Sequence, residues 1–266
     1  MSTHKGTAII TGASSGIGAA FARELARSGY NLILQGRRRE LLQSLCDEVA
    51  RNHGIKAEYL IAELSDPEDL RILENRVGGT TDLGMLVNCA GFSSLMNFSD
   101  EDIDGQENII RVHIIASVRL THAALPVMLL RRHGAIINVS SVAAYFISPG
   151  SVMYCATKLF LNSFTEALHL ELRGTGIRVQ ALCPGYTTSD FHTKLGYDTS
   201  KEFFKNFMPA ERVVETSLKY LDRGKVVCIP GFKYKIAAQL PRIIPRPLLY
   251  RLVMMVTKGR KYPAPR

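Results

Sequence analysis

The chain has 266 residues, of which 46% are apolar and 21% charged, an ordinary globular composition that is ample for a hydrophobic core. Its five cysteines are widely scattered, without the paired spacing of a zinc site or a disulfide framework. We therefore expect a reducing compartment and a cytoplasmic protein. The first residues carry no apolar signal region, and no uninterrupted apolar run is long enough to cross a bilayer.

The net charge of +9 comes from one part of the chain. Residues 223–266 contain eleven Lys or Arg and no Asp or Glu, which leaves 22 basic against 24 acidic residues in the rest. A basic segment of this kind can bind nucleic acid, but no nucleic-acid-binding motif accompanies it. We therefore expect no nucleic-acid partner.

A phosphate-binding turn is indicated near the N-terminus. Residues 7–10 are an apolar run of buried-strand type, residues 11–18 are rich in glycine, and a helical pattern begins at Ala19. Glycines let a backbone approach phosphate closely, and a helix N-terminus offers free N–H groups and the positive end of its dipole. The spacing is G-x-x-x-G-x-G, a variant of the dinucleotide fingerprint. A plain strand-to-helix turn is the alternative.

The end of the second predicted strand bears on the choice of dinucleotide. Residues 31–35 read as this strand, and Gly36, Arg37 and Arg38 follow it. In a dinucleotide site, an acid at this position binds the ribose hydroxyls of NAD, whereas a guanidinium suits a 2′-phosphate. The missing acid favours NADP(H) over NAD(H), with Arg37 and Arg38 as candidate ligands. The alternative is a basic helix start that only faces solvent.

The rest of the chain alternates strands with helices. We predict further strands over residues 58–62, 83–87, 134–141, 176–183 and 226–229, and helices near 38–53, from Pro67 onward, and near 101–112, 114–132, 153–173 and 210–222. This alternation predicts an α/β fold with a Rossmann-type, doubly wound parallel sheet of about seven strands. We expect a single domain over residues 1–232 and a basic, proline-containing extension over residues 233–266.

A tyrosine and a lysine four residues apart suggest acid–base chemistry. Tyr154 and Lys158 share one face of a predicted helix. An ammonium one turn away favours the phenolate and lowers the pKa of the phenol, which gives a group able to exchange protons near neutrality. Ser140 and Ser141 end a predicted strand, at the carboxyl edge where ligands bind in open α/β sheets. The alternative is a surface Tyr and Lys on an amphipathic helix.

Together, these patterns resemble the classical short-chain dehydrogenase/reductase (SDR) family over roughly residues 5–230. The resemblance rests on motifs in one order: Thr11 with Gly12, Gly16 and Gly18, then Asn88-Cys89-Ala90-Gly91, Ser141, Tyr154 with Lys158, and Pro184-Gly185. It implies that Tyr154 is the general acid or base at a carbonyl or alcohol oxygen and that Ser141 hydrogen-bonds this oxygen. Lys158 would lower the Tyr154 pKa and bind the nicotinamide ribose.

The same resemblance implies a cofactor site made of four groups of residues. The pyrophosphate would lie against Gly12, Ser14, Ser15, Gly16, Ile17 and Gly18. Asn88, Ala90 and Gly91 would line the adenosine ribose side, with Glu63 and Leu64 near the adenine. Pro184, Gly185, Thr187 and Ser189 would hold the carboxamide end of the nicotinamide.

Three positions depart from the family's pattern. His113 stands where an asparagine usually supports a water near the lysine. Either its imidazole only packs in the core, which is the interpretation we favour, or it joins a proton relay with the catalytic groups. Glu63 replaces an adenine-contacting aspartate, and Ser189 replaces a threonine while keeping the hydroxyl.

The candidate substrate-binding segments are rich in aromatic and aliphatic residues. They are residues 92–98, 145–147 and 186–208. This composition favours a lipophilic ketone or aldehyde over a sugar or small acid, and the alternative is that the side chains only pack a lid. We interpret the chain as an NADP(H)-dependent carbonyl reductase or alcohol dehydrogenase. The alternative function is a cofactor-binding regulator or scaffold without turnover.

Two expectations concern partners. The family resemblance suggests a homodimer or homotetramer assembled through the helices at 114–132 and 153–173. Residues 233–266 place basic residues beside an apolar, proline-bounded helix, which could lie on an anionic membrane surface or cap a lipid-binding pocket. Packing of this extension on the domain or on a neighbouring subunit is the interpretation we favour, because interfacial helices usually have a more segregated basic face.

Overall fold

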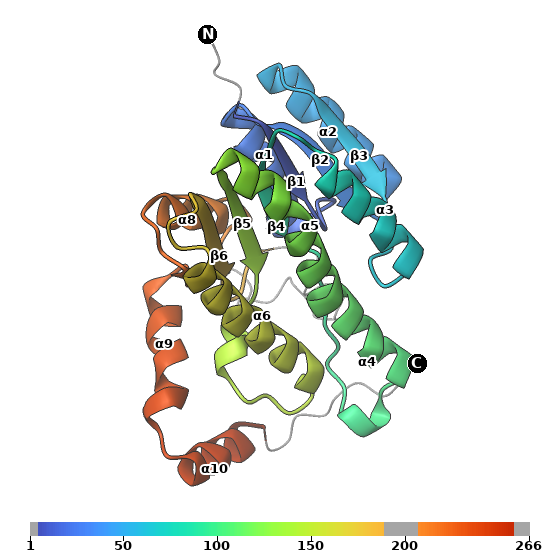
Figure 1. The fold of residues 1–266 in the computed structure, drawn as a ribbon. Helices are drawn as coiled ribbons and strands as arrows, with labels where there is room; N and C mark the ends of the chain where they lie inside the picture. Colours follow the sequence, from blue (N-terminus) through green and yellow to red (C-terminus); the bar gives the residue numbers. More distant parts are fainter. Residues whose placement is uncertain (1–4, 189–206, 258–266) are drawn as a thin grey trace.

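The computed structural model describes residues 5–188 and 207–257 (Figure 1). In these residues seven parallel strands form one sheet in the order β3-β2-β1-β4-β5-β6-β7. The strands are β1 (Thr7–Ile10), β2 (Asn31–Gly36), β3 (Ala57–Ile61), β4 (Leu83–Asn88), β5 (Gly134–Val139), β6 (Ile177–Leu182) and β7 (Val227–Cys228). The predicted doubly wound α/β sheet is therefore confirmed.

The helices follow the predicted alternation with one difference in the middle of the chain. They are α1 (Gly16–Arg27), α2 (Arg39–His53), α3 (Pro67–Gly78), α4 (Ile103–Ile110), α5 (Ala116–Arg131), α6 (Val152–Glu171), α8 (Ala210–Asp222), α9 (Phe232–Ile243) and α10 (Arg246–Thr257). Where the sequence predicts two separate helices, α4 and α5 run into each other through a π-helical turn, η2 (Arg111–Ile115). Such turns often mark functional sites, and this one carries His113.

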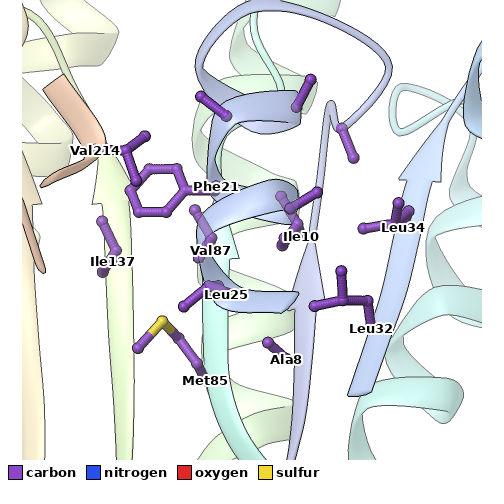
Figure 2. Close-up of a cluster of buried hydrophobic side chains, with 14 of the residues drawn as sticks. Ala8, Ile10, Phe21, Leu25, Leu32, Leu34, Met85, Val87, Ile137 and Val214 are labelled. Carbon is purple, nitrogen blue, oxygen red and sulfur yellow. The ribbon is translucent and has the colours of Figure 1, made fainter. Parts of the chain in front are cut away.

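Helices cover both faces of the sheet. On one face, α1, α2 and α8 bury Phe21, Leu42 and Val213 against the strands. Figure 2 shows Phe21 and Leu25 of α1 beside Ile10, Val87 and Ile137 of the central strands. On the other face α3, α5 and α6 do the same, with large side chains that include Leu73, Leu120 and Leu168.

Coverage on both faces explains the strand sequences. Every residue of β1, β4 and β5 is buried, so these strands are continuous apolar runs rather than alternating ones. The helices that cover these strands contribute to the same core, and removing the buried Phe21 side chain of α1 would cost about 3–5 kcal/mol.

The topology gathers the candidate site residues at one edge. All strands are parallel, so Thr11 after β1, Gly36 at the end of β2 and Ser140 after β5 lie at the same edge of the sheet. The strand order reverses beside β1, which pairs with both β2 and β4. Ligands of open α/β sheets bind at such a switch point, in the crevice at the carboxyl ends of the strands.

One helical run has the length and hydropathy of a membrane-crossing segment, Ile103–Arg131. Its side chains Val112, Leu120, Ala124 and Met128 belong to the hydrophobic core on one face of the sheet. We therefore interpret it as a core helix. The five cysteines are all unpaired thiols, as their spacing predicts.

Candidate active site

The glycine-rich turn between β1 and α1 is compact enough to require glycine at two positions. Gly12 has a φ of 65°, and a Cβ there would stand 2.8 Å from the Cα of Ala90. A Cβ on Gly18 would stand 2.4 Å from the carbonyl oxygen of Gly12. Helix α1 begins at Gly16, with no acidic residue in its first turn. These residues fit the pyrophosphate of a dinucleotide.

Two buried polar side chains fix this turn against the neighbouring strands. The Thr11 hydroxyl accepts hydrogen bonds from the backbone N–H groups of Cys89 (2.9 Å) and Ala90 (3.0 Å). The Gln35 side chain accepts from Gly12 N–H (3.1 Å) and donates to the carbonyl of Ala62 (2.7 Å). The sequence analysis missed Gln35, although a glutamine inside an apolar strand is a signal that could have found it.

The two arginines after β2 take different partners. Arg38 donates to the hydroxyls of Ser14 (3.1 Å) and Ser15 (2.6 Å), so its guanidinium lies on the predicted phosphate turn. Arg37 instead forms an ion pair with Glu63 at 2.9 Å. The sequence favours Arg37 as the phosphate ligand, whereas the structure brings Arg38 onto the turn.

The Glu63 carboxylate accepts hydrogen bonds from Arg37 and from the N–H of Ser65. Burial raises the pKa of its carboxyl, but the hydrogen bond from Arg37 and the bond from Ser65 N–H together outweigh this effect, so the pKa is lowered. Glu63 is therefore a carboxylate engaged by Arg37 at neutral pH, and an adenine amino group would share it. Leu64 beside it is buried in the core.

Asn88 differs from its predicted role. Its side-chain amide is buried and donates to Asn138 of β5 (2.8 Å) and Thr121 of α5 (3.2 Å). Asn138 in turn donates to Thr165 of α6 at 2.9 Å. The side chain thus ties the sheet to two helices rather than lining the adenosine ribose, and a cofactor contact from Asn88 would have to come from its backbone. Its Oδ1 has no hydrogen-bond partner among the described residues.

Ser141, Tyr154 and Lys158 converge beyond the end of β5. Ser141 begins the short 3-10 helix η3 (Val142–Tyr145), and its side chain is hydrogen-bonded to that of Tyr154. The Lys158 ammonium lies 5.7 Å from the centre of the Tyr154 ring and donates to the carbonyl oxygen of Val139 at 2.8 Å. By contrast, the Ser140 hydroxyl donates to the backbone carbonyl of Lys158. The geometry therefore separates the two serines as the sequence spacing predicts.

The pKa values of this group are governed by burial. Burial raises the pKa of Tyr154 to about 12, although the hydrogen bond with Ser141 lowers it in part. Burial also lowers the pKa of Lys158 to about 8. The sequence predicts that Lys158 lowers the Tyr154 pKa, whereas in this structure burial raises that pKa and the group that lowers it in part is Ser141. At neutral pH the phenol is therefore protonated and able to donate.

His113 is fully buried beside these groups, with both ring nitrogens engaged. Its Nε2 accepts from the backbone N–H of Phe92 (3.1 Å), so in the neutral ring Nδ1–H donates to the Thr157 hydroxyl (2.9 Å). Burial, reinforced by the charge of Lys158, lowers the pKa of His113 well below its usual value. A neutral imidazole with both nitrogens occupied favours the packing interpretation over the proton relay.

The predicted nicotinamide-binding segment is covered by the C-terminal extension. A Cβ on Gly185 would stand 2.3 Å from the ring of Tyr234 in α9, and the Tyr234 hydroxyl accepts from the N–H of Tyr186 (3.1 Å). Thr187 is buried and donates to the carbonyl of Gly185 at 3.0 Å. Ser189 lies outside the described residues. Tyr234 was missed by the sequence analysis, since nothing local to residue 234 signals this contact.

One side of Tyr154 faces a small cleft of mixed polarity. Its apolar lining includes Met96 and Phe98 from the predicted segment 92–98, and its polar lining includes Ser94, Glu101 and Gln106. The second predicted segment differs in part, because the Tyr145 hydroxyl meets the Cys183 thiol (3.8 Å) and its ring lies under the guanidinium of Arg242. Tyr145 therefore belongs to the contact with α9.

This fold and this site define an oxidoreductase that binds a nicotinamide cofactor and acts on CH–OH or C=O groups. A family model described as short chain dehydrogenase matches residues 6–200. The chain belongs to the short-chain dehydrogenase/reductase family.

Curated relatives span several substrate classes. An uncharacterized oxidoreductase of Myxococcus xanthus is 31% identical over 91% of this chain and 94% of its own. The 17-beta-hydroxysteroid dehydrogenase type 3 of Rattus norvegicus is 32% identical over 91% of this chain and 78% of its own. A very-long-chain 3-oxoacyl-CoA reductase of Anas platyrhynchos is 34% identical over 68% of this chain, which spans 60% of that enzyme's length.

Solved structures agree with this placement. A short-chain dehydrogenase from Sphingobium yanoikuyae in complex with NADPH has a TM-score of 0.82 and 32% identity, over 98% of both chains. A 7beta-hydroxysteroid dehydrogenase has a TM-score of 0.84 and 26% identity, over 94% of this chain and 97% of the other.

Proposed function

We propose that this protein is an NADPH-preferring reductase of lipophilic ketones or aldehydes, with Tyr154 as the general acid. The observation that carries the proposal is the hydrogen bond between Ser141 and Tyr154 beside the Lys158 ammonium. Two hydroxyls that meet in this way can bind one carbonyl oxygen together, because each has a hydrogen to donate.

The residues of this chain have distinct tasks in that reaction. The bound nicotinamide cofactor supplies or accepts the hydride. Tyr154, protonated at neutral pH because its pKa is about 12, donates a proton to the substrate oxygen as negative charge develops there. The Ser141 hydroxyl holds the same oxygen in position. Lys158 keeps N–H donors beyond the one used by Val139, and these suit ribose hydroxyls.

The preference for NADPH rests on the end of β2. Gly36 offers no carboxylate to bind the ribose hydroxyls of NAD, and Arg38 lies on Ser14 and Ser15 where a 2′-phosphate would add to their hydrogen bonds. A bidentate guanidinium is well suited to that phosphate. The NADPH complex of the Sphingobium yanoikuyae relative supports the same preference.

The preference for a lipophilic substrate rests on the cleft beside Tyr154. Its lining combines the apolar side chains of Met96, Phe98, Ile109 and Val152 with polar ones that include Glu101 and Gln106. Apolar side chains beside a few polar groups are typical of sites for lipophilic ligands. The oxoacyl and hydroxysteroid substrates named for the relatives are of this kind.

The test is oxidation of NADPH, and separately of NADH, with a panel of lipophilic ketones and aldehydes. Tyr154→Phe should lower turnover roughly 10²- to 10⁴-fold while cofactor binding, followed by fluorescence, persists. Tyr145→Phe is the matched control, because the Tyr145 hydroxyl meets Cys183 outside the cleft, and it should keep turnover close to wild type. Substantial turnover in Tyr154→Phe would refute the assigned acid.

The alternative function is a cofactor-binding regulator without turnover. It would be favoured if NADPH bound with unchanged strength to the wild type and to Tyr154→Phe but was oxidised by neither with any carbonyl of the panel. The hydrogen-bonded Ser141 and Tyr154 argue for the enzyme, since a scaffold has no need to pair these two hydroxyls.

We also propose a homodimer or homotetramer formed through α5 and α6. Helix α6 exposes Leu159 (54%) and Leu170 (63%), and the last turn of α5 exposes Leu130 (88%). Apolar side chains gathered on neighbouring helices are typical of subunit interfaces. Members of this family are commonly oligomers, which supports the proposal.

A further inference from the structure

The C-terminal helices expose more apolar surface than they bury. On α9, Phe232, Ile236, Leu240 and Ile243 recur at the spacing of one helical face, and each is 45% exposed or more. The opposite face packs on the body of the protein through Tyr234 and the fully buried Ala238. Helix α9 therefore has two apolar faces, and only one of them contacts the domain.

Helix α10 is held even more weakly. Leu249 is its one buried side chain in the described residues, whereas Leu248, Leu252 and Met255 form an exposed stripe. The helix ends in Met254, Met255 and Val256, which are 62–72% exposed. We call the exposed apolar side chains of α9 and α10 the tail surface. Exposed apolar patches of this kind are typical of surfaces that bind another protein or a membrane.

The charge around the tail surface is of one sign. Among the described residues, 223–257 hold seven basic and no acidic residues. Lys233, Arg246 and Arg251 are exposed among the apolar side chains, while Lys235 donates to Tyr220 and Arg242 lies over Tyr145. The acidic residue that faces α9 from the body is Glu166, in the cavity on the inner side of the helix.

The charge of the tail surface distinguishes between two binding partners, a second copy of the chain and a lipid surface. A second copy docked tail to tail would place like charges opposite each other, which is unfavourable. An anionic lipid surface offers complementary charge for the arginines and lysines and an apolar layer for the exposed stripes. We propose that the tail surface docks on an anionic membrane, with α9 and α10 lying in the plane of the interface.

The position of the tail surface is compatible with docking while the enzyme works. Figure 1 shows α10 beyond the carboxyl ends of the strands, at the same end of the molecule as the candidate active site. The glycine-rich turn and Arg38 lie on other elements and take no part in the tail surface. The proposal is independent of the proposed function, since it concerns lipid binding and not turnover.

The test is co-sedimentation of the full chain with vesicles of phosphatidylcholine alone or mixed with phosphatidylglycerol. We expect binding to the mixed vesicles at low salt, and a large loss at about 0.5 M salt, where the Debye length falls below about 5 Å. Absence of binding to the mixed vesicles at low salt would overturn the proposal. Equal binding to both kinds of vesicle would overturn its electrostatic part.

Matched variants test whether the tail surface is the part of the protein that binds the vesicles. Ile243→Gln, Leu248→Gln and Met255→Gln together should weaken partition at least roughly tenfold, whereas Leu41→Gln, Ile72→Gln and Ile103→Gln, at exposed positions elsewhere, should not. Equal loss in the two triple variants would contradict the assignment of the tail surface.

A second pair of variants tests the basic residues of the tail surface. Both variants change the net charge of the protein by the same amount. Arg246→Glu with Arg251→Glu should weaken binding to mixed vesicles at least roughly tenfold, while Arg212→Glu with Lys219→Glu on α8 should have little effect. Light scattering without lipid tests the alternative that the tail surface binds a second copy of the chain. Self-association that the apolar tail variant abolishes, in a protein that binds no vesicles, would assign the tail surface to a second copy instead.

Discussion

Arg37 and Arg38 are neighbours in the sequence, yet their surroundings differ. Arg38 donates to two serines of the glycine-rich turn, whereas Arg37 is exposed and paired with Glu63. A phosphate that approaches the turn would meet the Arg38 guanidinium beside the hydroxyls of Ser14 and Ser15. It would reach Arg37 only by competing with a carboxylate whose pKa is lowered by that same arginine.

We therefore predict that Arg38→Ala raises the KM for NADPH roughly 10- to 100-fold, the effect of losing hydrogen bonds to a charged group. The KM for NADH should change much less. Arg37→Ala is the matched control and should affect NADPH less than Arg38→Ala does. Steady-state kinetics with both cofactors measure the difference, and a larger NADPH loss in Arg37→Ala would move the phosphate site to Arg37.

The burial of His113 predicts that the free energy of unfolding decreases in acid. Its pKa is lowered in the folded state by burial and by Lys158, so below about pH 6.5 the unfolded chain binds a proton that the folded protein does not. The contribution of His113 to the free energy of unfolding is therefore fully present above about pH 6.5. It falls by about 1.4 kcal/mol for each pH unit below that value.

His113→Asn should remove this part of the pH dependence of the free energy of unfolding. Urea titrations at neutral pH and near pH 5 would measure it. His122→Asn on α5 is the control, because His122 is exposed, and it should keep the wild-type slope. An unchanged slope in His113→Asn would mean that the acid sensitivity arises elsewhere.

At the scale of elements, the strands could be predicted from the sequence because parallel strands buried on both faces leave continuous apolar runs, as in β4 and β5. The site residues of the turn after β1 and of α6 follow from local spacing in the same way. The π-helical turn at Arg111–Ile115 could not be predicted, because one extra residue in a helical turn leaves the hydrophobic pattern nearly unchanged. The partners of Asn88 depend on packing across three elements.

The contact between α9 and the segment after β6 is another feature that tertiary packing decides. Tyr234 packs on Gly185 from 49 positions further along the chain. We predict that Tyr234→Ala raises the KM for NADPH roughly tenfold, because a segment placed against the cofactor loses its support. Tyr234→Phe keeps the ring and should change the KM little. If both variants matched the wild type in KM and thermal stability, α9 would have no influence on the cofactor site.

At the scale of the whole molecule, two of the regions that expose apolar side chains differ in charge. Helices α5 and α6 together carry both signs, with Arg119 and Arg131 on α5 and Glu166 and Glu171 on α6, whereas α9 and α10 carry basic residues and no acidic ones. A mixed surface can meet its own copy without like-charge repulsion. This difference leads us to assign the first region to self-association and the second to lipid.

We predict that the protein elutes as a dimer or tetramer of its 29.5 kDa chain. Leu159→Glu with Leu170→Glu should shift it toward the monomer, because two charges would be buried at the α6 interface. Size-exclusion chromatography with light scattering reports the mass. Ile72→Glu on α3 is the control, and a monomeric wild type would refute the assembly.

The strand order has a consequence for synthesis of the chain. The first strand made, β1, ends up in the interior of the sheet, with β2 on one side and β4 on the other. A nascent chain that has reached β3 can complete only one side of β1, and its other edge stays open until β4 emerges from the ribosome. An open apolar edge invites pairing with other chains. The interval between residues 61 and 83, and the longer one between residues 88 and 134 before β5 is made, are therefore when a growing chain needs a chaperone.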